Sequence, residues 1–346
     1  MCTQGLMHQR RKETQLLACL NGDTQAAGIT TGFEHYRFQH QALPEIDWEE
    51  IDLSCTLLGK RLRAPIVITS MTGGCRLGAE INRNLALAAQ HLGLAMGLGS
   101  QRAALIDPEL AETYQVRRYA PAILLLGNLG AVQLNQGFGL AECRRALDMV
   151  EADGLCLHLN GLQEAQQAGG DRGFRGLKRR IAEVCQQLEA PVVAKEVGLG
   201  VSREAAAALV ECGVSAIDAA GAGGTSWYLV ERLSAGMGRE EALASPFASW
   251  GIPTAESLTQ ALTVARGVPV IASGGIRNGV DAAKALAIGA AAVGLAQPLL
   301  QPATKSAEAV IARLEQLLLE LRTTLFCVGA ADIEALRRTS CLVKVS

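Results

Sequence analysis

The chain has 346 residues, of which 49% are hydrophobic, 19% charged and 4% aromatic, and its formal net charge is −2. This composition supports a large aliphatic core and excludes an intrinsically disordered chain. A near-neutral chain without basic blocks does not suit a nucleic-acid-binding protein. Ten cysteines without a C-x-x-C pair exclude a small disulfide scaffold and give no zinc-ligand spacing.

Targeting and membrane signals are also absent. Residues 1–15 are polar and basic and lack the apolar centre of a signal peptide. No stretch approaches the roughly 18 apolar residues that a membrane span needs. We therefore expect a cytoplasmic protein with reduced thiols that binds neither membranes nor nucleic acids.

The N-terminal part of the chain precedes any regular pattern. Residues 1–62 are predicted to form an arm and extension that packs on the main domain, which covers residues 63–346. The arm contains the basic run Arg10-Arg11-Lys12. Such a run is usually a solvated terminal patch, and its functional interpretation is an arm that closes over a phosphorylated substrate.

Eight short aliphatic runs follow, most of them about 25–35 residues apart, which is the size of one strand–helix unit. They predict strands at residues 65–70, 94–99, 122–127, 154–159, 191–196, 215–219, 268–273 and 291–295. The gap between the sixth and seventh strands is longer and predicts an inserted loop around residues 234–251.

The stretches between the strands carry apolar residues at three- and four-residue steps, which is typical of amphipathic helices. They predict helices at residues 81–92, 140–152, 177–188, 203–212, 255–266, 280–288 and 303–326. Ser202 and Gly213 are predicted to cap the two ends of the helix at 203–212. Eight alternations of strand and helix favour the α/β class and a single (β/α)8 TIM barrel with an N-terminal extension.

Functional sites of this fold lie where the strands end. All eight predicted strands end in small, polar or ionisable residues, which suits a ligand bound at the mouth. Ser273-Gly-Gly275 after the seventh strand and Gly294 to Gln297 after the eighth match the usual phosphate site of such barrels. Taken alone, the two glycines after Ser273 could be merely turn glycines.

Lys195 ends a buried strand, where a lysine must find a negative partner or lose its proton. It could stabilise the anionic pyrimidine edge of a reduced flavin, which we favour, or it could pair with Asp218. Asn128 can donate to and accept from the same ring edge.

The fourth strand ends near His158, and a lone histidine is often only structural. Asn160, Gln163 and Glu164 come next within the same short segment, which favours contact with a ligand. Glu164 is a hard oxygen donor that could hold Mg²⁺ together with phosphate oxygens and water. The alternative for Glu164 is a solvated carboxylate at a helix start.

These segments together resemble the type 2 isopentenyl-diphosphate isomerases, the flavin-dependent enzymes of isoprenoid biosynthesis. The specific strings are His158-x-Asn-x-Leu-Gln-Glu164 and Gly221-Ala-Gly-Gly-Thr-Ser-Trp227, supported by Met71-Thr-Gly-Gly74, Ser100-Gln-Arg102 and Lys195-Glu-Val-Gly198. The resemblance implies isomerisation of isopentenyl diphosphate to dimethylallyl diphosphate with reduced FMN and Mg²⁺, with NADPH as the reductant. A homo-oligomer is also expected.

The resemblance further implies the roles of individual residues. FMN would contact Ser70, Met71, Thr72, Gly73, Ser100, Asn128, Lys195, Thr225, Gly275, Ile276, Arg277, Ala296 and Gln297. The substrate would contact Arg11, Lys12, Ser100, Gln101, Arg102, His158, Asn160 and Gln163. Glu164 would bind Mg²⁺. Because the sequence places no pair of carboxylates for acid/base work, we expect the N5 nitrogen of the reduced flavin to give and take the proton, with Gln163 and His158 as the catalytic side chains.

The sequence departs from the family pattern at three positions. Gln15 stands where the family's Arg-Lys-x-x-His has histidine, Gly161 replaces the usual proline, and Gln297 replaces the usual arginine before Pro298. These changes predict a weaker closure or diphosphate contact, a looser turn and weaker FMN binding.

Two alternatives stay open. One is an FMN-dependent oxidoreductase of the 2-hydroxy-acid oxidase or inosinate-dehydrogenase type, which needs a His–Arg pair or a loop cysteine that residues 221–227 do not supply. The other is a non-catalytic flavin-binding barrel, against which the charged substrate contacts argue.

Overall fold

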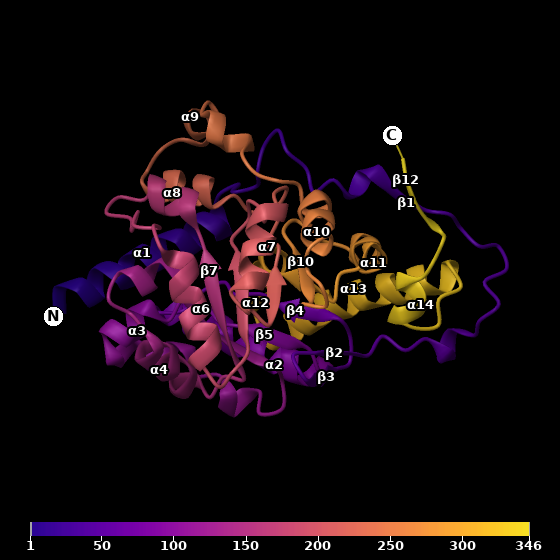
Figure 1. Ribbon diagram of the computed structural model, residues 1–346, viewed down its shortest axis with the longest axis horizontal. Coiled ribbons are helices and arrows are strands. Elements are labelled where there is room, and N and C mark those ends of the chain that lie inside the picture. The colour runs from indigo at the N-terminus through magenta and orange to yellow at the C-terminus, as the bar shows by residue number, and fades with distance from the viewer. Residues whose placement is uncertain (1, 346) are drawn as a thin grey trace.

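Eight parallel strands close into a barrel (Figure 1). The computed structural model describes the backbone of residues 2–345 and the side chains of residues 9–345. The strands follow one another around the barrel in chain order, and the last pairs with the first. They are β4 (Ile66–Ile68), β5 (Ala95–Gly97), β6 (Leu125–Gly130), β7 (Gly154–Leu159), β8 (Val192–Glu196), β9 (Ala216–Asp218), β10 (Val270–Ser273) and β11 (Ala292–Leu295). The predicted TIM barrel is therefore confirmed.

One strand is displaced from its prediction. β6 begins at Leu125 and ends at Gly130, three residues later than expected at both ends. The carbonyls of Ala120, Pro121 and Ile123 accept hydrogen bonds from the Arg117 guanidinium. This side chain occupies the carbonyls of these three residues, and the first contact of the stretch with β5 is made by the Leu124 carbonyl, which accepts from the Met96 amide.

Helices surround the barrel where the periodicity predicts them. They are α2 (Arg76–Leu92), α4 (Leu140–Val150), α6 (Leu177–Gln187), α7 (Arg203–Glu211), α10 (Thr254–Leu262), α11 (Gly279–Ile288) and α13 (Ala307–Cys327). The predicted caps of α7 are present, since the Ser202 hydroxyl accepts from the Ala205 amide and Gly213 has a φ of +83°.

Two predicted segments differ from the structure. Residues 234–251 do not form a plain loop, because α8 (Trp227–Ser234), α9 (Arg239–Leu243) and a 3-10 turn at Pro246–Ser249 bury a small apolar cluster of their own. The last predicted helix, residues 303–326, corresponds to α13, which begins at residue 307 because Ser306 caps it by accepting from the Ala309 amide; the short α12 (Gln297–Ala303) before it was not predicted.

A β-hairpin closes the amino end of the barrel. It consists of β2 (Cys55–Leu57) and β3 (Lys60–Leu62). Leu57 and Leu62 pack against inward-facing aliphatic residues near the starts of the strands, among them Val67, Leu126 and Val193. The hairpin thus completes the barrel core at the end opposite the strand termini.

The rest of the N-terminal extension lies along the barrel. α1 (Cys2–Asn21) contacts α8, α3 (Arg102–Ile106), α12 and α2 (Figure 1). Farther along, β1 (Tyr36–Phe38) pairs antiparallel with β12 (Leu342–Lys344), which comes after α14 (Ile333–Arg337) near the end of the chain. Among the described residues, no helix combines the length and the hydropathy needed to cross a membrane.

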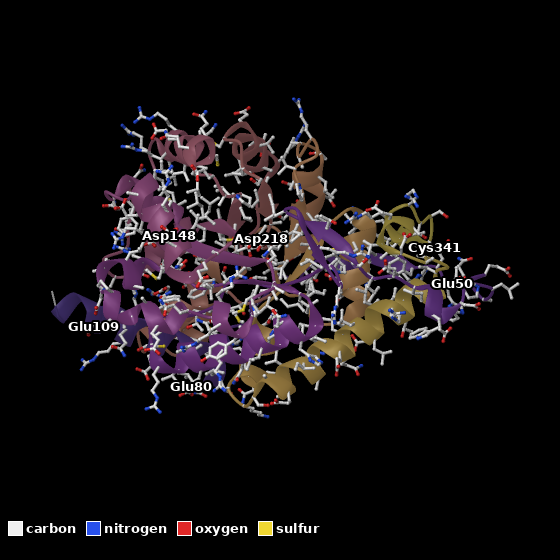
Figure 2. All side chains as sticks on the ribbon, turned by 90° about the horizontal axis from the view of Figure 1, so that it is seen from below. Glu50, Glu80, Glu109, Asp148, Asp218 and Cys341 are labelled. Atoms are coloured by element: carbon white, nitrogen blue, oxygen red, sulfur yellow. The ribbon has the colours of Figure 1, made fainter. Side chains whose placement is uncertain are left out.

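The labelled carboxylates differ in their exposure to solvent. Figure 2 labels Glu50, Glu80, Glu109 and Asp148, of which Glu80 and Glu109 lie near the outline of the molecule, and Asp218 in its interior. The side chains of the first four are exposed, whereas Asp218 is only 3% exposed. A carboxylate so far from water requires partners that stabilise its charge, and these are described with the site.

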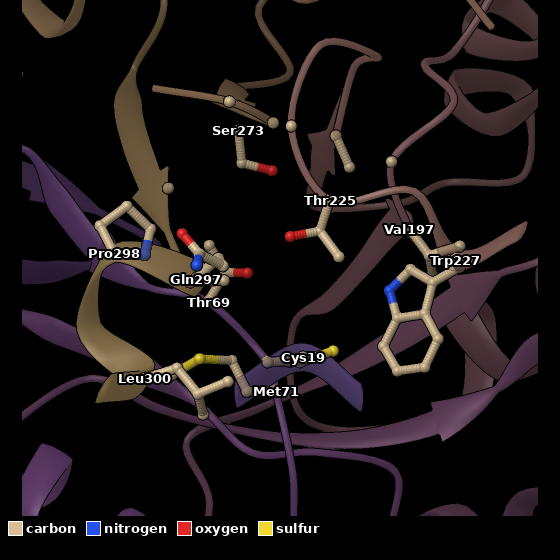
Figure 3. Close-up of a pocket in the computed structure, with 18 of the residues that line it drawn as sticks. Cys19, Thr69, Met71, Val197, Thr225, Trp227, Ser273, Gln297, Pro298 and Leu300 are labelled. Atoms are coloured by element: carbon tan, nitrogen blue, oxygen red, sulfur yellow. The ribbon is translucent and has the colours of Figure 1, made fainter. Parts of the chain in front are cut away.

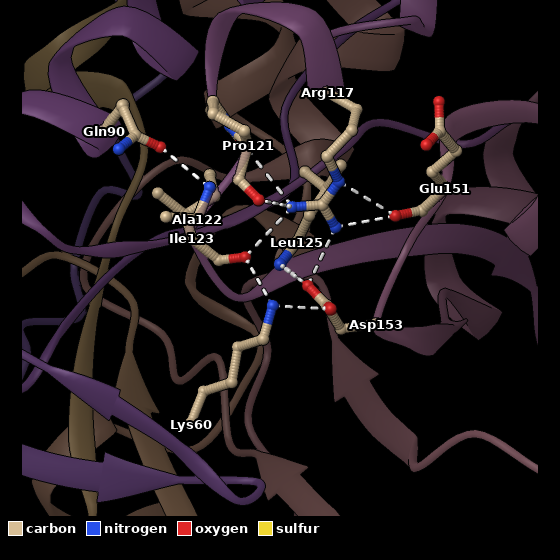
Figure 4. A network of polar contacts seen from close by, with 10 residues as sticks. Lys60, Gln90, Arg117, Pro121, Ala122, Ile123, Leu125, Glu151 and Asp153 are labelled. Carbon is tan, nitrogen blue, oxygen red and sulfur yellow. Dashed lines mark hydrogen bonds and ion pairs between the residues drawn. The ribbon is translucent and has the colours of Figure 1, made fainter.

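Asp153 joins three segments at the amino end of the barrel (Figure 4). Lys60 Nζ of the hairpin donates to Oδ1 at 2.6 Å, while Arg117 Nη2 and the Leu125 amide donate to Oδ2 at 2.9 and 2.8 Å. Burial alone would raise the pKa of Asp153, but these donors outweigh it and hold the pKa below its ordinary value. The carboxylate therefore stabilises the folded state in its ionised form.

We expect Asp153→Asn to lower the free energy of unfolding by about 2–3 kcal/mol at pH 7, because two cations lose their charged partner. The folded pKa is depressed, so this contribution is present above the unfolded pKa of about 3.9 and is lost as the pH falls through the lower folded pKa. Urea unfolding of both proteins from pH 7 to pH 3 measures it. Equal stability at pH 7 would contradict the assignment.

Candidate active site

Two adjoining pockets open at the carboxyl end of the barrel strands. The first encloses about 980 Å³ and the second about 800 Å³. They share a wall made of residues from the arm and from three strand ends: Lys12, Gln15, Ser70, Met71, Lys195, Val197 and Trp227. Pockets of this size at this end of the fold suit a cofactor beside a small substrate.

Loops after β4, β8, β9, β10 and β11 line the first pocket (Figure 3). α1 covers one side of it with Lys12, Gln15, Leu16 and Cys19. Figure 3 shows Thr69, Thr225 and Ser273 around the interior, with Met71, Cys19 and Leu300 grouped along one side. The pocket therefore combines hydroxyl groups with an apolar wall.

Glycines allow two of these loops to stack directly on each other. Gly274 and Gly275 have φ values of +104° and +72°. A Cβ on Gly274 would lie 2.1 Å from the Gly221 carbonyl oxygen, and one on Gly224 would lie 2.4 Å from the Gly275 amide nitrogen. These glycines are turn residues, and they are also required by the close backbone approach between the β9 and β10 loops.

Lys195 was expected either to contact the flavin or to pair with Asp218, and its position allows both. Its Nζ lies 3.7 Å from Asp218 Oδ2 and donates to the Glu196 carbonyl at 2.6 Å. The Ser273 hydroxyl donates to Asp218 Oδ1 at 2.5 Å. Lys195 nevertheless lines both pockets, so the pair with Asp218 holds a cation at the wall between them.

Glu196 shapes the neighbouring part of that wall. Its Oε2 accepts from the amides of Val197, Gly198 and Leu199 at 2.6–2.7 Å. Burial raises the pKa of Glu196 to about 7, although these amides and Lys195 oppose the shift. The three hydrogen bonds fix the loop that presents Val197 to both pockets.

The second pocket is the polar one. Its lining includes Arg11, Lys12 and Arg102 as cations, and Ser100, Asn128, His158, Asn160, Gln163 and Glu164 as further polar groups. His158 Nδ1 lies 2.8 Å from Asn128 Oδ1. Burial and the nearby Lys12 and Lys195 lower the pKa of His158 to about 3, so the ring is neutral and donates this hydrogen bond from Nδ1.

The arm supplies cations to this pocket. Burial, and next Arg11, lower the pKa of Lys12 to about 8. Arg102 Nη1 lies 2.5 Å from Asp171 Oδ2, and Gln133 Nε2 donates to the same oxygen at 3.2 Å. The mutual repulsion of the cations is typical of a site built for an anion.

Glu164 is buried beside Asn160. Its Oε1 accepts from Asn160 Nδ2 at 2.9 Å and its Oε2 accepts from the Asp171 amide at 2.7 Å. Asn160 Oδ1 is buried without a hydrogen-bond partner among the described side chains. Residues 9–345 contain no group of three His, Cys, Asp or Glu side chains arranged around a metal ion. A hard cation would therefore bind through Glu164, with Asn160 Oδ1 and ligand oxygens completing its shell.

Glu231 on α8 is a functional candidate that the sequence reasoning missed. Its Oε1 accepts from Gln163 Nε2 at 2.7 Å and from Gln15 Nε2 at 2.8 Å. Burial, as the largest effect, raises the pKa of Glu231. One buried carboxylate oxygen thus joins the arm to the side-chain amide of Gln163. The contact from the arm comes from Gln15, which stands where the family has histidine.

The predicted site residues fall into two groups in the structure. Of those assigned to FMN, all but Gly73, Ser100 and Asn128 line the first pocket, and Ser100 and Asn128 line the second. Gly73 lies against the Tyr114 ring, since a Cβ on Gly73 would come within 2.1 Å of a ring carbon. Of those assigned to substrate, all but Gln101 line the second pocket.

Gln101 does not reach either pocket, contrary to its expected contact with substrate. Its side chain is fully buried, donates to the Ala146 carbonyl and accepts from the Asn128 amide, both at 2.8 Å. It points away from the mouth and anchors the strand that carries Asn128. Gln133, which does line the second pocket, was missed because the third strand was predicted to end three residues too early.

Solved structures share this fold at low sequence identity. A mandelate oxidase matches with a TM-score of 0.66 and 18% identity, over 96% of this chain and 95% of that one. A flavocytochrome b2 matches with a TM-score of 0.68 and 18% identity, over 95% and 82% of the two chains. At this identity the likeness concerns the fold alone.

Sequence comparisons are more specific. The FMN-dependent dehydrogenase family matches residues 19–117 and 176–343, which leaves out the segment with Asn128, His158, Asn160 and Glu164. The "Isopentenyl-diphosphate delta-isomerase" of a Nostoc species is 50% identical over 97% of this chain and 96% of its own. That of a Synechococcus species is 51% identical over 96% of both chains, and that of Oceanobacillus iheyensis is 46% identical over 96% and 95%.

With half of its residues shared over nearly the full length of these relatives, and with the flavin family matched over most of the barrel, the chain belongs to the isopentenyl-diphosphate delta-isomerases of the FMN-dependent type.

Proposed function

We propose that the chain isomerises isopentenyl diphosphate to dimethylallyl diphosphate, with reduced FMN in the first pocket and the substrate in the second. The observation that carries the proposal is the shared wall. A glycine-lined pocket meets, across Lys195 and Val197, a pocket that gathers Arg11, Lys12 and Arg102 around a buried carboxylate. The relatives' name supplies the reaction, and the two pockets fit its cofactor and its substrate.

The first pocket fits FMN by its chemistry. The Ser70 hydroxyl is buried there without a hydrogen-bond partner among the described residues, so it is available to a ligand. Backbone amides of the Gly274–Arg277 loop, with Thr225, Ala296 and Gln297, would hold the phosphate. Lys195 would face the pyrimidine edge. When bound and reduced, FMN supplies the acid/base group that moves a proton across an alkene.

The second pocket fits a diphosphate. Arg11, Lys12 and Arg102 would bind its oxygens by charge-assisted hydrogen bonds. His158 is neutral, so it would orient the substrate by hydrogen bonding and not by charge. Mg²⁺ would bind through Glu164 and Asn160 Oδ1. These contacts use the non-reacting part of the substrate to fix the position of the hydrocarbon.

Gln163 is held for a positional role. An amide is not a useful base, but its Nε2 donates to Glu231 and its Oε1 accepts from Asn160 Nδ2 at 3.2 Å, so both ends of the group are held. Met71, Val197 and Trp227 stand at the junction of the pockets, where the hydrocarbon would lie. Their apolar surface, together with α1, would keep water away from the reacting carbons.

The oxidoreductase alternative is less well supported. Hydroxy-acid oxidation of this type needs a His–Arg pair, whereas His158 Nδ1 is hydrogen-bonded to the side-chain oxygen Oδ1 of Asn128. Cytoplasmic location is supported by the described cysteines, all of which are free thiols. NADPH as the reductant and a homo-oligomeric state stay predictions from the sequence.

We expect isomerase activity to require reduced FMN and to consume no net electrons, because product and substrate are at the same oxidation level. One reduction of the flavin should then support many turnovers. Product formation and NADPH oxidation are measured together under anaerobic conditions. Oxidation of one NADPH for each product molecule would overturn the proposed function.

We expect Glu164→Gln to raise the Mg²⁺ concentration for half-maximal activity at least about tenfold, because a neutral amide is a poor ligand for a hard cation. The absorption spectrum of bound FMN should not change. Glu204→Gln, at the exposed start of α7, is the matched control. An unchanged Mg²⁺ requirement would leave Glu164 as a carboxylate that only anchors the Asp171 amide.

We expect kcat/KM to decline above about pH 8, since the Lys12 pKa is about 8 in the free protein and only the cationic form attracts a diphosphate. Lys12→Arg should remove this decline, because a guanidinium keeps its proton at that pH. Steady-state kinetics from pH 6 to pH 10 test both proteins. A decline that persists in Lys12→Arg would assign it to another group.

A further inference from the structure

Residues 22–26, which we call the strap, cross the phosphate end of the first pocket. Gln25 forms an isolated antiparallel bridge with Thr225. On either side, the Ala26 amide donates to the Gly224 carbonyl and the Ser226 amide donates to the Thr24 carbonyl, both at 2.8 Å. The strap is therefore hydrogen-bonded along its length to the β9 loop that lines the pocket.

The outer side of the strap is anchored as well. Arg239 on α9 donates from Nε to the Asp23 carbonyl at 2.9 Å, and its Nη2 lies 2.8 Å from Asp23 Oδ2. A cavity of about 620 Å³ lies against the strap, bounded also by Thr225, Arg277 and Gln297. All three of these residues line the first pocket too, so the strap and the phosphate end share one boundary.

The side chain of Gln25 uses both ends of its amide. Nε2 donates to the Gly223 carbonyl at 2.6 Å, which fixes the orientation of the group. Oε1 then accepts from Nη2 of Arg277. The Arg277 carbonyl accepts in turn from the Arg313 guanidinium, so Arg277 is held at its backbone and at its charged end.

We infer that Gln25 is a positioning residue for the cofactor phosphate, because it holds the Arg277 guanidinium at the phosphate end of the first pocket. The inference rests on the proposed function in one respect, namely that the first pocket takes FMN. Among the described residues that bound the cavity against the strap, Gln297 carries no charge and Arg277 is the one cation. An arginine fixed before the ligand arrives loses less conformational freedom on binding.

This role is specific for the phosphate group, and that makes it testable. Riboflavin has the ring system and ribityl chain of FMN but no phosphate. A residue that acts through Arg277 should matter for FMN and not for riboflavin. A residue that only supports the fold of the mouth should affect both ligands alike.

The experiment titrates the flavin-free protein with FMN and with riboflavin, and monitors flavin fluorescence. Gln25→Leu keeps the side-chain volume and removes both amide contacts. We expect it to raise the Kd for FMN roughly three- to tenfold, the effect of one side chain that must be ordered on binding. The Kd for riboflavin should not change. Gln41→Leu is the matched control, a half-buried glutamine on the same extension that bonds to Gln39 and Cys341.

Two further variants complete the test. Gln25→Glu places a carboxylate against Arg277, and we expect it to weaken FMN binding more than Gln25→Leu does, since it neutralises the cation. In an Arg277→Gln background, Gln25→Leu should have no additional effect on the Kd for FMN. Thermal melts of all variants report whether the fold is kept.

The outcomes are distinguishable. An unchanged Kd for FMN in both Gln25 variants, or an equal loss of FMN and riboflavin, would overturn the inference and leave the proposed function intact. A Gln25→Leu effect that persists in full without Arg277 would also overturn it. If the unsubstituted protein bound no FMN, the proposed function itself would fail, and the inference with it.

Discussion

Closure of a parallel barrel is the constraint on which this molecule depends. Because all eight strands run in the same direction around a closed sheet, their carboxyl ends meet on a single rim. Residues as distant in sequence as Ser70, Lys195 and Ser273 become neighbours only for that reason. The hairpin of β2 and β3 fills the opposite end with aliphatic side chains, so the rim is the end at which polar groups can gather. Cofactor and substrate pockets side by side are a consequence of this geometry.

The N-terminal extension turns an open rim into an enclosed site. α1 brings Arg11, Lys12 and Gln15 to the pockets, and the strap continues from it across the β9 loop. Neither segment belongs to the barrel. α1 packs Leu16, Cys19 and Leu20 against the core, and both segments also hydrogen-bond to the barrel, α1 through Glu231 and the strap through the backbone of the β9 loop. The substrate end and the cofactor end of the mouth are therefore covered by one continuous piece of chain.

Local sequence pattern is enough to predict the barrel and much of its mouth. Short aliphatic runs and helical periodicity locate the strands and helices, and polar residues directly after each run locate Ser70, Lys195 and the glycines after Ser273 at the mouth. Residues inside a strand or beside it are harder to predict, because one step along a strand reverses the direction of a side chain. Gln101 was expected at the substrate because the family resemblance implied it, whereas its side chain points into the wall and bonds to the Ala146 carbonyl and the Asn128 backbone amide.

Long-range polar contacts lie outside what such patterns can predict. Glu231 sits on an amphipathic helix, where a single carboxylate is usually solvated, and nothing local indicates that two glutamines from distant segments will reach it. The helical form of the arm was missed for a similar reason. α1 has only a short apolar patch, Leu16, Cys19 and Leu20, packed against the core, and the rest of its described part is polar.

The sharing of one atom by Gln15 and Gln163 has a consequence of its own. Both amides donate to Oε1 of Glu231, which uses both lone-pair sites of that carboxylate oxygen. Displacement of α1 would remove Gln15 from that oxygen, while Gln163 would keep its contacts with Glu231 and with Asn160 Nδ2. Burial raises the pKa of Glu231, whereas Arg11 and Gln15 both lower it, so the position of the arm and the ionisation of this buried carboxylate are linked.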